Sequence, residues 1–322
     1  MEVLNFTFAK EMINIISKVI IQSHVQSRVN SIMKRNSSWD NWQFIWSGRN
    51  GNCLELNINK RKFALKVSLT ERIHRETELE LYIQNKYPWL IPYIHLKGIY
   101  KNKNQVYYWV LQDLVEGKTW KSMWDDYIPE ALQLKYLGGN IAQVHNVAQD
   151  KPPGYAYLNN QGKGPHNNID EYVTNVKTEI EKNSWKAWNL TGVILLKLTQ
   201  MYKSLLEKNS REVKLLHWDI HQWNILFNWN TSQLIDFWWT IRWWFPEEEF
   251  ALMITWNPSI RESGVLKTLI HEYEKLTWYK INMDWINFFL LLVWTKKWMR
   301  KWGIDWEYWY ILKSVIEPII NS

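Results

Sequence analysis

Residues 215–227 have the sequence LLHWDIHQWNILF, and residues 234–237 have the sequence LIDF. The first stretch holds His217, Asp219 and Asn224 in the spacing H-x-D-x-x-x-x-N. The second stretch is a short apolar segment that ends in an Asp-Phe pair. A loop with this spacing, followed by a strand that ends in Asp-Phe, is typical of phosphoryl-transfer sites.

The chemistry of phosphoryl transfer explains the spacing. One carboxylate has to meet the incoming hydroxyl, and an Asn five residues further on has to face a metal ion from the same loop. A second carboxylate, from the neighbouring strand, completes the metal shell. Mg²⁺ prefers oxygen ligands, so Asn and Asp suit it. Five positions and their strand context agree with this layout, and we prefer it to an ordinary polar surface turn.

These residues resemble the motif of the aminoglycoside phosphotransferase and choline-kinase-like families, which share the protein-kinase fold and usually carry His-Gly-Asp-x-His-x-x-Asn. The resemblance implies that Asp219 is the catalytic base, that Asn224 and Asp236 hold Mg²⁺, and that His217 braces the loop. It also implies an α+β, protein-kinase-like fold with two lobes. The N-lobe would be a small antiparallel sheet with one helix, and the C-lobe would be larger and mainly helical.

The N-terminal half contributes a second part of the resemblance. Residues 63–67, FALKV, look like the lysine-bearing third strand of these kinases. By resemblance Lys66 contacts the α- and β-phosphates of ATP, and Glu76 on the following helix pairs with it. Glu78 and Glu80 stand nearby, so a neighbouring register of the pair stays open.

Two further segments complete the expected nucleotide site. The turn that holds Ser47, Gly48 and Gly51 resembles the loop that covers the nucleotide, where glycine lets backbone amides approach phosphates. It lacks a full G-x-G-x-x-G and would otherwise be an ordinary hairpin turn. Gln112 and Leu114 lie where these families have the hinge that contacts adenine.

Periodicity and turn residues divide the chain in the same way. We expect a helical segment over 1–38, a nucleotide-binding N-lobe over 39–115 and a catalytic, substrate-binding C-lobe over 116–322. The segments expected in the N-lobe are strands at 42–46, 54–58, 62–67, 94–99 and 106–112 and a helix at 70–86. Those expected in the C-lobe are helices at 129–147, 169–183 and 191–208, a hairpin at 225–235 and a helical remainder.

Composition limits the partners. The net charge of +7 is spread along the chain without a block of like charges, so we expect no nucleic-acid partner. Cys53 is the one cysteine, which excludes a disulfide within the chain and fits a reducing cytoplasm. The apolar run at 285–294 is about half as long as a membrane span, and the N-terminus does not resemble a signal peptide. We expect a cytoplasmic monomer or weak homodimer that takes ATP, Mg²⁺ and a small-molecule hydroxyl substrate.

The tryptophan content is abnormal. The chain has 24 Trp and 12 Gly, where a usual glycine share predicts roughly 23 Gly. Five of the tryptophans stand where the resembled motifs or a hairpin turn favour glycine: Trp218, Trp223, Trp229, Trp238 and Trp244. Some bacterial lineages translate UGA as glycine, and a table that translates UGA as tryptophan would write Trp at those codons. We therefore hypothesise that many of these residues are glycine.

Several alternatives stay open. Genuine tryptophans at the motif positions would favour a catalytically impaired, pseudokinase-type nucleotide-binding module. A protein kinase is disfavoured, because about ten residues between Asp236 and Pro246 leave no room for an activation segment. The acceptor is open among aminoglycosides, amino alcohols such as choline, homoserine and sugars. The acidic run Glu247 to Glu249 either attracts a cationic aminosugar or is a solvated helix start.

Overall fold

The chain divides by its internal contacts into two compact units, which meet in sequence between Val115 and Glu116. The computed structural model describes residues 42–48, 51–58, 61–86, 88, 91–102, 105–120, 129–146, 156–157, 165–182, 188–208, 212–228, 231–236, 242–300 and 312–321. The helical segment expected over 1–38 lies outside these residues. We describe each unit by itself.

The first unit is built on a five-stranded antiparallel sheet in the order β1-β2-β3-β5-β4. Its strands are β1 (Trp42–Gly48), β2 (Gly51–Ile58), β3 (Arg61–Ser68), β4 (Ile94–Asn102) and β5 (Gln105–Asp113). The alternation of Leu54 and Leu56 with polar residues predicts a strand, and both leucines are buried opposite Leu65 and Phe63 of β3. Strands β4 and β5 form a hairpin, and β5 also pairs with β3, so β5 lies inside the sheet and β4 at its edge.

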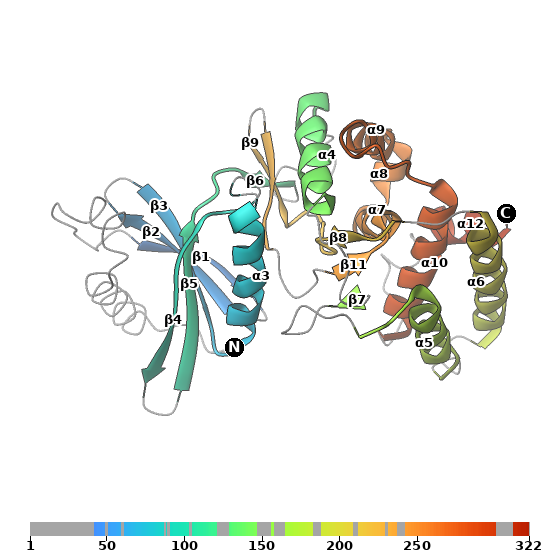
Figure 1. Cartoon of the computed structure of the whole chain (residues 1–322), viewed down its shortest axis with the longest axis horizontal. Coiled ribbons are helices and arrows are strands. Elements are labelled where there is room, and N and C mark those ends of the chain that lie inside the picture. The colour runs from blue at the N-terminus through green and yellow to red at the C-terminus, as the bar shows by residue number, and fades with distance from the viewer. Residues whose placement is uncertain are drawn as a thin grey trace. The chain divides into compact units, whose positions relative to one another are not determined.

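One helix, α3 (Arg72–Lys86), packs against this sheet (Figure 1). Ile73 of α3 lies in a buried cluster with Ile94 of β4 and Val110 of β5. At the other end of the helix, the side chain of Gln84 accepts a hydrogen bond of 2.6 Å from the backbone N–H of Ile94. Apolar packing and buried hydrogen bonding between Gln84 and Ile94 therefore fix the helix beside β4 and β5.

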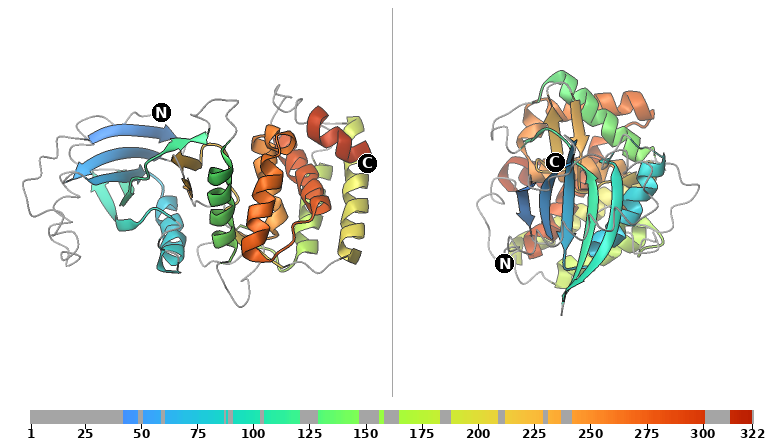
Figure 2. Two further views of the ribbon diagram at one scale, coloured as in Figure 1. Left: turned by 90° about the horizontal axis from the view of Figure 1, so that it is seen from above. Right: turned by 90° about the vertical axis from the view of Figure 1, so that its left-hand side faces the viewer.

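The second unit is mainly helical, and its helices lie side by side (Figure 2). The helices are α4 (Ala131–His145), α5 (Ile169–Lys182), α6 (Trp188–Lys208), α7 (Pro246–Trp256), α8 (Ser259–Glu262), α9 (Val265–Thr277), α10 (Met283–Arg300), the π-helical η3 (Leu312–Ile316) and α12 (Glu317–Asn321). The apolar run at 285–294 forms the buried part of α10. In the described part of the chain, no helix is both long enough and apolar enough for a membrane span.

Two small sheets interrupt the helices. One has the order β10-β9-β6 and the other β7-β11-β8. The strands are β6 (Lys118–Thr119), β7 (Ala156–Tyr157), β8 (Lys214–Leu216), β9 (Ile225–Asn228), β10 (Thr231–Leu234) and β11 (Arg242–Trp244). The β9-β10 hairpin is the one predicted from sequence. Strands of two or three residues are too short to show a periodic pattern, and the other four were not predicted.

Helix α4 holds this hairpin in place. Its Asn140 donates a hydrogen bond of 2.7 Å to the backbone carbonyl of Ser232 in β10, and Gln133 donates one of 3.4 Å to the carbonyl of Asn228 in β9. Gln133 also accepts from the N–H of Glu130 and so closes the first turn of the helix. The β9-β10 hairpin, which directly follows the loop from residue 217 to residue 224, is thus attached to a rigid element.

Candidate active site

The loop from His217 to Asn224 connects β8 to β9 and is held at both ends. Leu216, which precedes it, is paired with Arg242 of β11, and Ile225, which follows it, is paired with Leu234 of β10. Inside the loop, the N–H of Asn224 donates to the carbonyl of His221 at 2.8 Å. Two strand pairings and a tight turn therefore determine where its side chains point.

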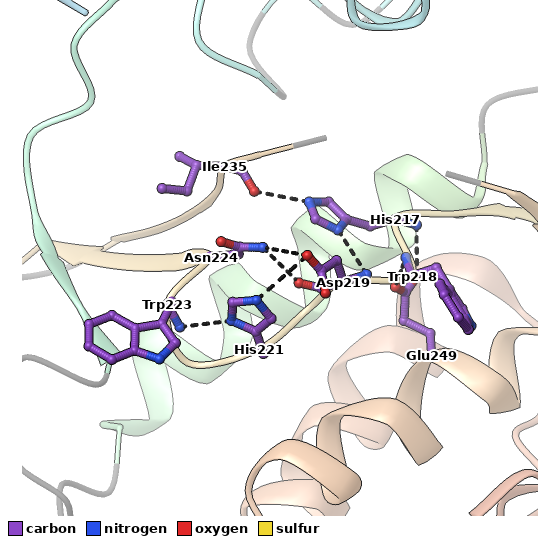
Figure 3. A network of polar contacts seen from close by, with 8 residues as sticks. All are labelled: His217, Trp218, Asp219, His221, Trp223, Asn224, Ile235 and Glu249. Carbon is purple, nitrogen blue, oxygen red and sulfur yellow. Dashed lines mark hydrogen bonds and ion pairs between the residues drawn. The ribbon is translucent and has the colours of Figure 1, made fainter. Parts of the chain in front are cut away.

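The carboxylate of Asp219 lies in the middle of the loop's polar contacts (Figure 3). Its Oδ2 accepts a hydrogen bond of 3.2 Å from the side-chain amide of Asn224 and lies 3.6 Å from Nε2 of His221. The side chain of Asp219 is 29% exposed, so an incoming group can reach it. A positioned carboxylate within reach of solvent can accept a proton from a hydroxyl.

His217 braces the loop from inside. The ring is fully buried, and burial lowers its pKa, although Glu249 and Asp219 oppose the shift. Its Nδ1 accepts from the N–H of Asp219 at 3.3 Å, so in the neutral ring Nε2 carries the proton and donates to the carbonyl of Ile235 at 3.1 Å. The neutral imidazole therefore connects the loop from residue 217 to residue 224 with the residue that follows β10.

Asp236 directly follows that connection. Its backbone is left-handed, with φ of 59°, a conformation that Asp tolerates better than most residues. The N–H of Ile235 donates to the carbonyl of Asn224 at 3.0 Å. Ile235, the residue before Asp236, is thus hydrogen-bonded both to His217 and to Asn224. These bonds bring the backbone next to Asp236 beside that of Asn224, the other predicted metal residue.

The donor set suits Mg²⁺. Because Nδ2 of Asn224 donates to Asp219, the amide oxygen of Asn224 faces away from that carboxylate. An amide oxygen and the carboxylate of Asp236 are hard oxygen ligands, and Mg²⁺ commonly takes one or two protein ligands together with substrate phosphates. Among the described residues, no group of three or more His, Cys, Asp or Glu side chains could hold a metal ion.

A buried glutamate holds the start of the loop. Glu249, in the first turn of α7, accepts hydrogen bonds from the backbone N–H groups of His217, at 3.1 Å, and Trp218, at 2.5 Å (Figure 3). It also contacts Nε2 of His145 on α4 at 2.8 Å.

The acidic run 247–249 is neither solvated nor open to a cationic substrate. All three carboxylates are fully buried, and each has different partners. Glu247 accepts from the hydroxyl of Tyr279, at 3.1 Å, and from the N–H of Asn282, while Glu248 accepts from Tyr172 at 3.4 Å. The predicted helix start is confirmed, because the run lies in the first turn of α7, but its predicted solvation and its attraction for a cationic substrate are wrong, since a Glu-rich helix start gives no sign of burial.

The tryptophans at motif positions differ in conformation. Trp218 has φ of 58°, a left-handed backbone that glycine adopts without strain and that costs other residues roughly 1–2 kcal/mol. Trp223 is 55% exposed, and Trp244 is fully buried, with its ring 4.6 Å from that of Tyr172. Trp229 and Trp238 lie outside the described residues. The glycine hypothesis thus gains a conformational argument at position 218.

The predicted nucleotide residues all belong to the first unit. Lys66 lies in the middle of β3, half-buried, between Cys53 of β2 and Val110 of β5. Glu76 and Glu80 are buried on one face of α3, whereas Glu78 is exposed and pairs with Lys97. This arrangement leaves Glu78 as the weakest of the three candidates for Lys66.

The turn and the hinge segment belong to the same sheet. Gly48 and Gly51 are paired at the end of the β1-β2 hairpin, next to Ser47. Gln112 is buried in β5, and Leu114 after that strand donates its N–H to the carbonyl of Lys62 at 3.2 Å. The contacts of these five residues with a nucleotide stay predictions.

No protein-family model matches the sequence, and no curated protein matches it. Solved structures match it over nearly its whole length. A thermostable mutant of aminoglycoside phosphotransferase APH(4)-Ia, in a ternary complex with AMP-PNP and hygromycin B, is 12% identical, with 91% of this chain and 97% of that chain covered and a TM-score of 0.66. This chain has the fold of the aminoglycoside phosphotransferases.

Two further solved structures match over similar shares of the chain. Spectinomycin phosphotransferase APH(9)-Ia, in complex with ADP and spectinomycin, is 12% identical, with 87% of this chain and 92% of that chain covered and a TM-score of 0.55. A protein from Haemophilus somnus named as a fructosamine-3-kinase is 12% identical, with 92% and 96% covered and a TM-score of 0.59. The predicted α+β, kinase-like fold is therefore confirmed.

Within this fold, three residues join the site to which the sequence had assigned no role at the loop. His221 stands beside the carboxylate of Asp219, and Glu249 holds the backbone of the loop. His145, at the end of α4, contacts Glu249. His221 is visible in the loop motif itself, but the other two lie far from it in sequence and only the fold brings them together.

Proposed function

We propose that this chain is a small-molecule kinase that transfers the γ-phosphate of ATP to a hydroxyl group. The observation that carries the proposal is the arrangement of Asp219 and Asn224 in one loop, joined through Ile235 to the backbone of Asp236. The fold shared with phosphotransferases that bind ATP analogues or ADP supports it.

In the proposed reaction, Asp219 accepts the proton of the acceptor hydroxyl as its oxygen attacks the γ-phosphorus. The new P–O bond forms while the bond from phosphorus to the β–γ bridging oxygen breaks, and ADP leaves. The proton then passes from Asp219 to solvent. Asn224 holds Asp219 in place, and catalysis is mainly positioning and electrostatic stabilisation.

Asn224 and Asp236 are the residues proposed to hold Mg²⁺, which when bound neutralises charge on the phosphates. Lys66 is proposed to contact the α- and β-phosphates, with Glu76 keeping the ammonium in place. Ser47, Gly48 and Gly51 are proposed to approach the phosphates through their backbone amides, and Gln112 and Leu114 to contact the adenine. The acceptor is proposed to be an aminoglycoside-like compound, an amino alcohol or a sugar, including sugar amines.

The second candidate is a nucleotide-binding module with impaired catalysis. The left-handed backbone of Trp218 favours it, because a strained tryptophan one residue before the catalytic base hinders the placement of that base. Both candidates bind nucleotide, and only the first releases ADP in the presence of an acceptor.

The test uses the chain as printed and its Trp218→Gly variant. Each is titrated with Mg·ATP in a thermal-shift assay and then assayed for ADP release with a panel of aminoglycosides, amino alcohols, fructosamines and sugars. A phosphorylated product detected by mass spectrometry, and lost in Asp219→Asn, supports the kinase. Nucleotide binding with no product from either protein supports the impaired module, and the absence of nucleotide binding contradicts both.

A further inference from the structure

Glu249 connects the catalytic loop to a buried chain of polar side chains in the second unit. Its carboxylate is fully buried, and an ionised carboxylate can only accept hydrogen bonds. Two of its donors are the N–H groups of His217 and Trp218, which come directly before Asp219. The third is Nε2 of His145, at 2.8 Å from Oε2. A buried carboxylate that loses one of these donors becomes unfavourable, because nothing replaces its hydration.

His145 is itself fixed on its other side. Its Nδ1 lies 2.9 Å from the hydroxyl of Tyr273 on α9, and the histidine ring is fully buried. Burial raises the pKa of Tyr273, so its hydroxyl keeps its proton and can donate to Nδ1. In the neutral ring Nε2 then carries the one N–H proton and donates it to Glu249, and in the protonated ring Nε2 donates as well.

The contacts therefore run in one line through three helices. They begin at Tyr273 on α9, pass through His145 at the end of α4 and Glu249 at the start of α7, and end on the backbone of the loop. Hydrogen bonds from two backbone N–H groups to one buried carboxylate fix the position and orientation of the peptide that leads into Asp219. Small displacements of a catalytic group are costly, since about 1 Å can lower a rate roughly 100-fold.

We propose that His145 and Tyr273 are positioning residues that act on Asp219 through Glu249. The inference rests on the proposed phosphotransferase function, because its consequence for rate needs a reaction at Asp219. It predicts that damage to this line lowers kcat and leaves the affinity for nucleotide in place, since none of the three side chains belongs to the predicted nucleotide residues.

The chain offers a matched control for Glu249. Glu247 lies two residues earlier in the same turn of α7 and is equally buried, but its partners are Tyr279 and Asn282. Glu249→Gln and Glu247→Gln therefore make the same chemical change at two buried positions of one helical turn, and the hydrogen bonds described for the loop from residue 217 to 224 are to Glu249. Both disturb stability, so kcat is compared at equal folded fractions, measured by thermal melting.

We expect Glu249→Gln and His145→Leu to lower kcat about 10- to 100-fold with KM for ATP changed less than about twofold. His145→Gln, whose amide can again donate to Glu249, should recover part of the loss. Tyr273→Phe removes one hydroxyl without changing shape, and we expect a fall of about three- to tenfold. Equal losses of kcat in Glu249→Gln and Glu247→Gln would overturn the proposal.

A second measurement keeps the test independent of activity. Amide hydrogen exchange is followed by mass spectrometry in peptides that cover residues 214–224. Faster exchange in Glu249→Gln and His145→Leu, but not in Glu247→Gln, supports the positioning role even if the chain phosphorylates none of the acceptors. Unchanged exchange in the first two variants refutes that role, whatever the outcome for the proposed function.

Discussion

The side-chain amide of Asn224 donates two hydrogen bonds to Asp219, one of 3.0 Å to its backbone carbonyl and one of 3.2 Å to Oδ2 of its carboxylate. One amide thus fixes both the main chain and the side chain of the proposed base. The same contacts determine which way the amide oxygen faces, and that oxygen is the atom proposed to bind Mg²⁺. The two residues therefore function as one unit.

Replacing Asn224 should damage both the base and the metal site. We expect Asn224→Ala to lower kcat about 10- to 100-fold and to raise the Mg²⁺ concentration needed for half-maximal activity. Steady-state rates measured over a Mg²⁺ titration test this. Asn228→Ala, an exposed change at the far end of β9, is the control. An unchanged Mg²⁺ dependence in Asn224→Ala would remove Asn224 from the proposed metal site.

Two of the candidate partners of Lys66 on α3, Glu76 and Glu78, can be distinguished by experiment. Glu76 is 7% exposed, whereas Glu78 has a side chain that is 68% exposed and pairs with Lys97. We expect Glu76→Gln to lower kcat/KM for ATP about 10- to 100-fold, because a charged hydrogen bond is lost, and Glu78→Gln to change it less than about twofold. Initial rates at varied ATP give both numbers. The reverse order of effects would move the pairing to Glu78.

Much of the first unit could be predicted from local sequence. The alternation around Leu54 and Leu56 and the turn residues between strands placed all five strands and α3 to within a few residues. The position of β5 between β3 and β4 was not predictable, because strand order depends on contacts between distant segments. The loop from His217 to Asn224 was predictable as chemistry, since its spacing follows from the reaction.

The support of that loop was not predictable in the same way. Glu249 follows two other glutamates and a proline, a pattern that favours an exposed helix start. Its burial results from His145 on α4 and from the loop backbone, which lie 104 and 32 residues away in sequence. A carboxylate can be buried only where hydrogen-bond donors surround it, and these donors come from segments that are distant in sequence.

The pH dependence of stability should reveal His217. Burial lowers the pKa of this ring in the folded state below the value of about 6.5 for an unfolded histidine. Below pH 6.5 the unfolded chain binds a proton that the folded ring resists, so stability is complete above this pH and falls as the pH decreases through the folded pKa. The slope is at most about 1.4 kcal/mol per pH unit.

The measurement is denaturant unfolding at several values between pH 5 and pH 7.5. His217→Gln can still donate to the carbonyl of Ile235 but cannot titrate, so its stability should depend less on pH in the acid range. The exposed His271 on α9 gives the control His271→Gln, which should keep the slope of the parent chain. Identical slopes in all three proteins would contradict a neutral, buried His217.

A second tryptophan has the conformation of Trp218. Trp278 ends α9 with φ of 58° and ψ of 3°, and its N–H donates to the carbonyl of Glu274 at 3.1 Å. Helices commonly end with a glycine in this left-handed conformation. The side chain of Trp278 is 91% exposed, so it gains little from burial. No motif marks this position in the sequence, and it is therefore an independent site for the hypothesis that UGA-encoded glycines are written as Trp.

Variants at positions 218 and 278 distinguish the effect of backbone strain on stability from its effect on catalysis. We expect Trp278→Gly to stabilise the chain by up to about 1 kcal/mol, the relief of left-handed strain less the added freedom of glycine in the unfolded state, with no change in kcat. Trp218→Gly should raise kcat, because it frees the backbone next to Asp219. Denaturant unfolding and ADP release measure the two effects. The codons at these positions test the hypothesis directly. UGA codons at both positions, and a native protein lighter by the corresponding mass, would establish glycine there. UGG codons, with no gain of activity in Trp218→Gly, would instead make the tryptophans genuine and favour the impaired module.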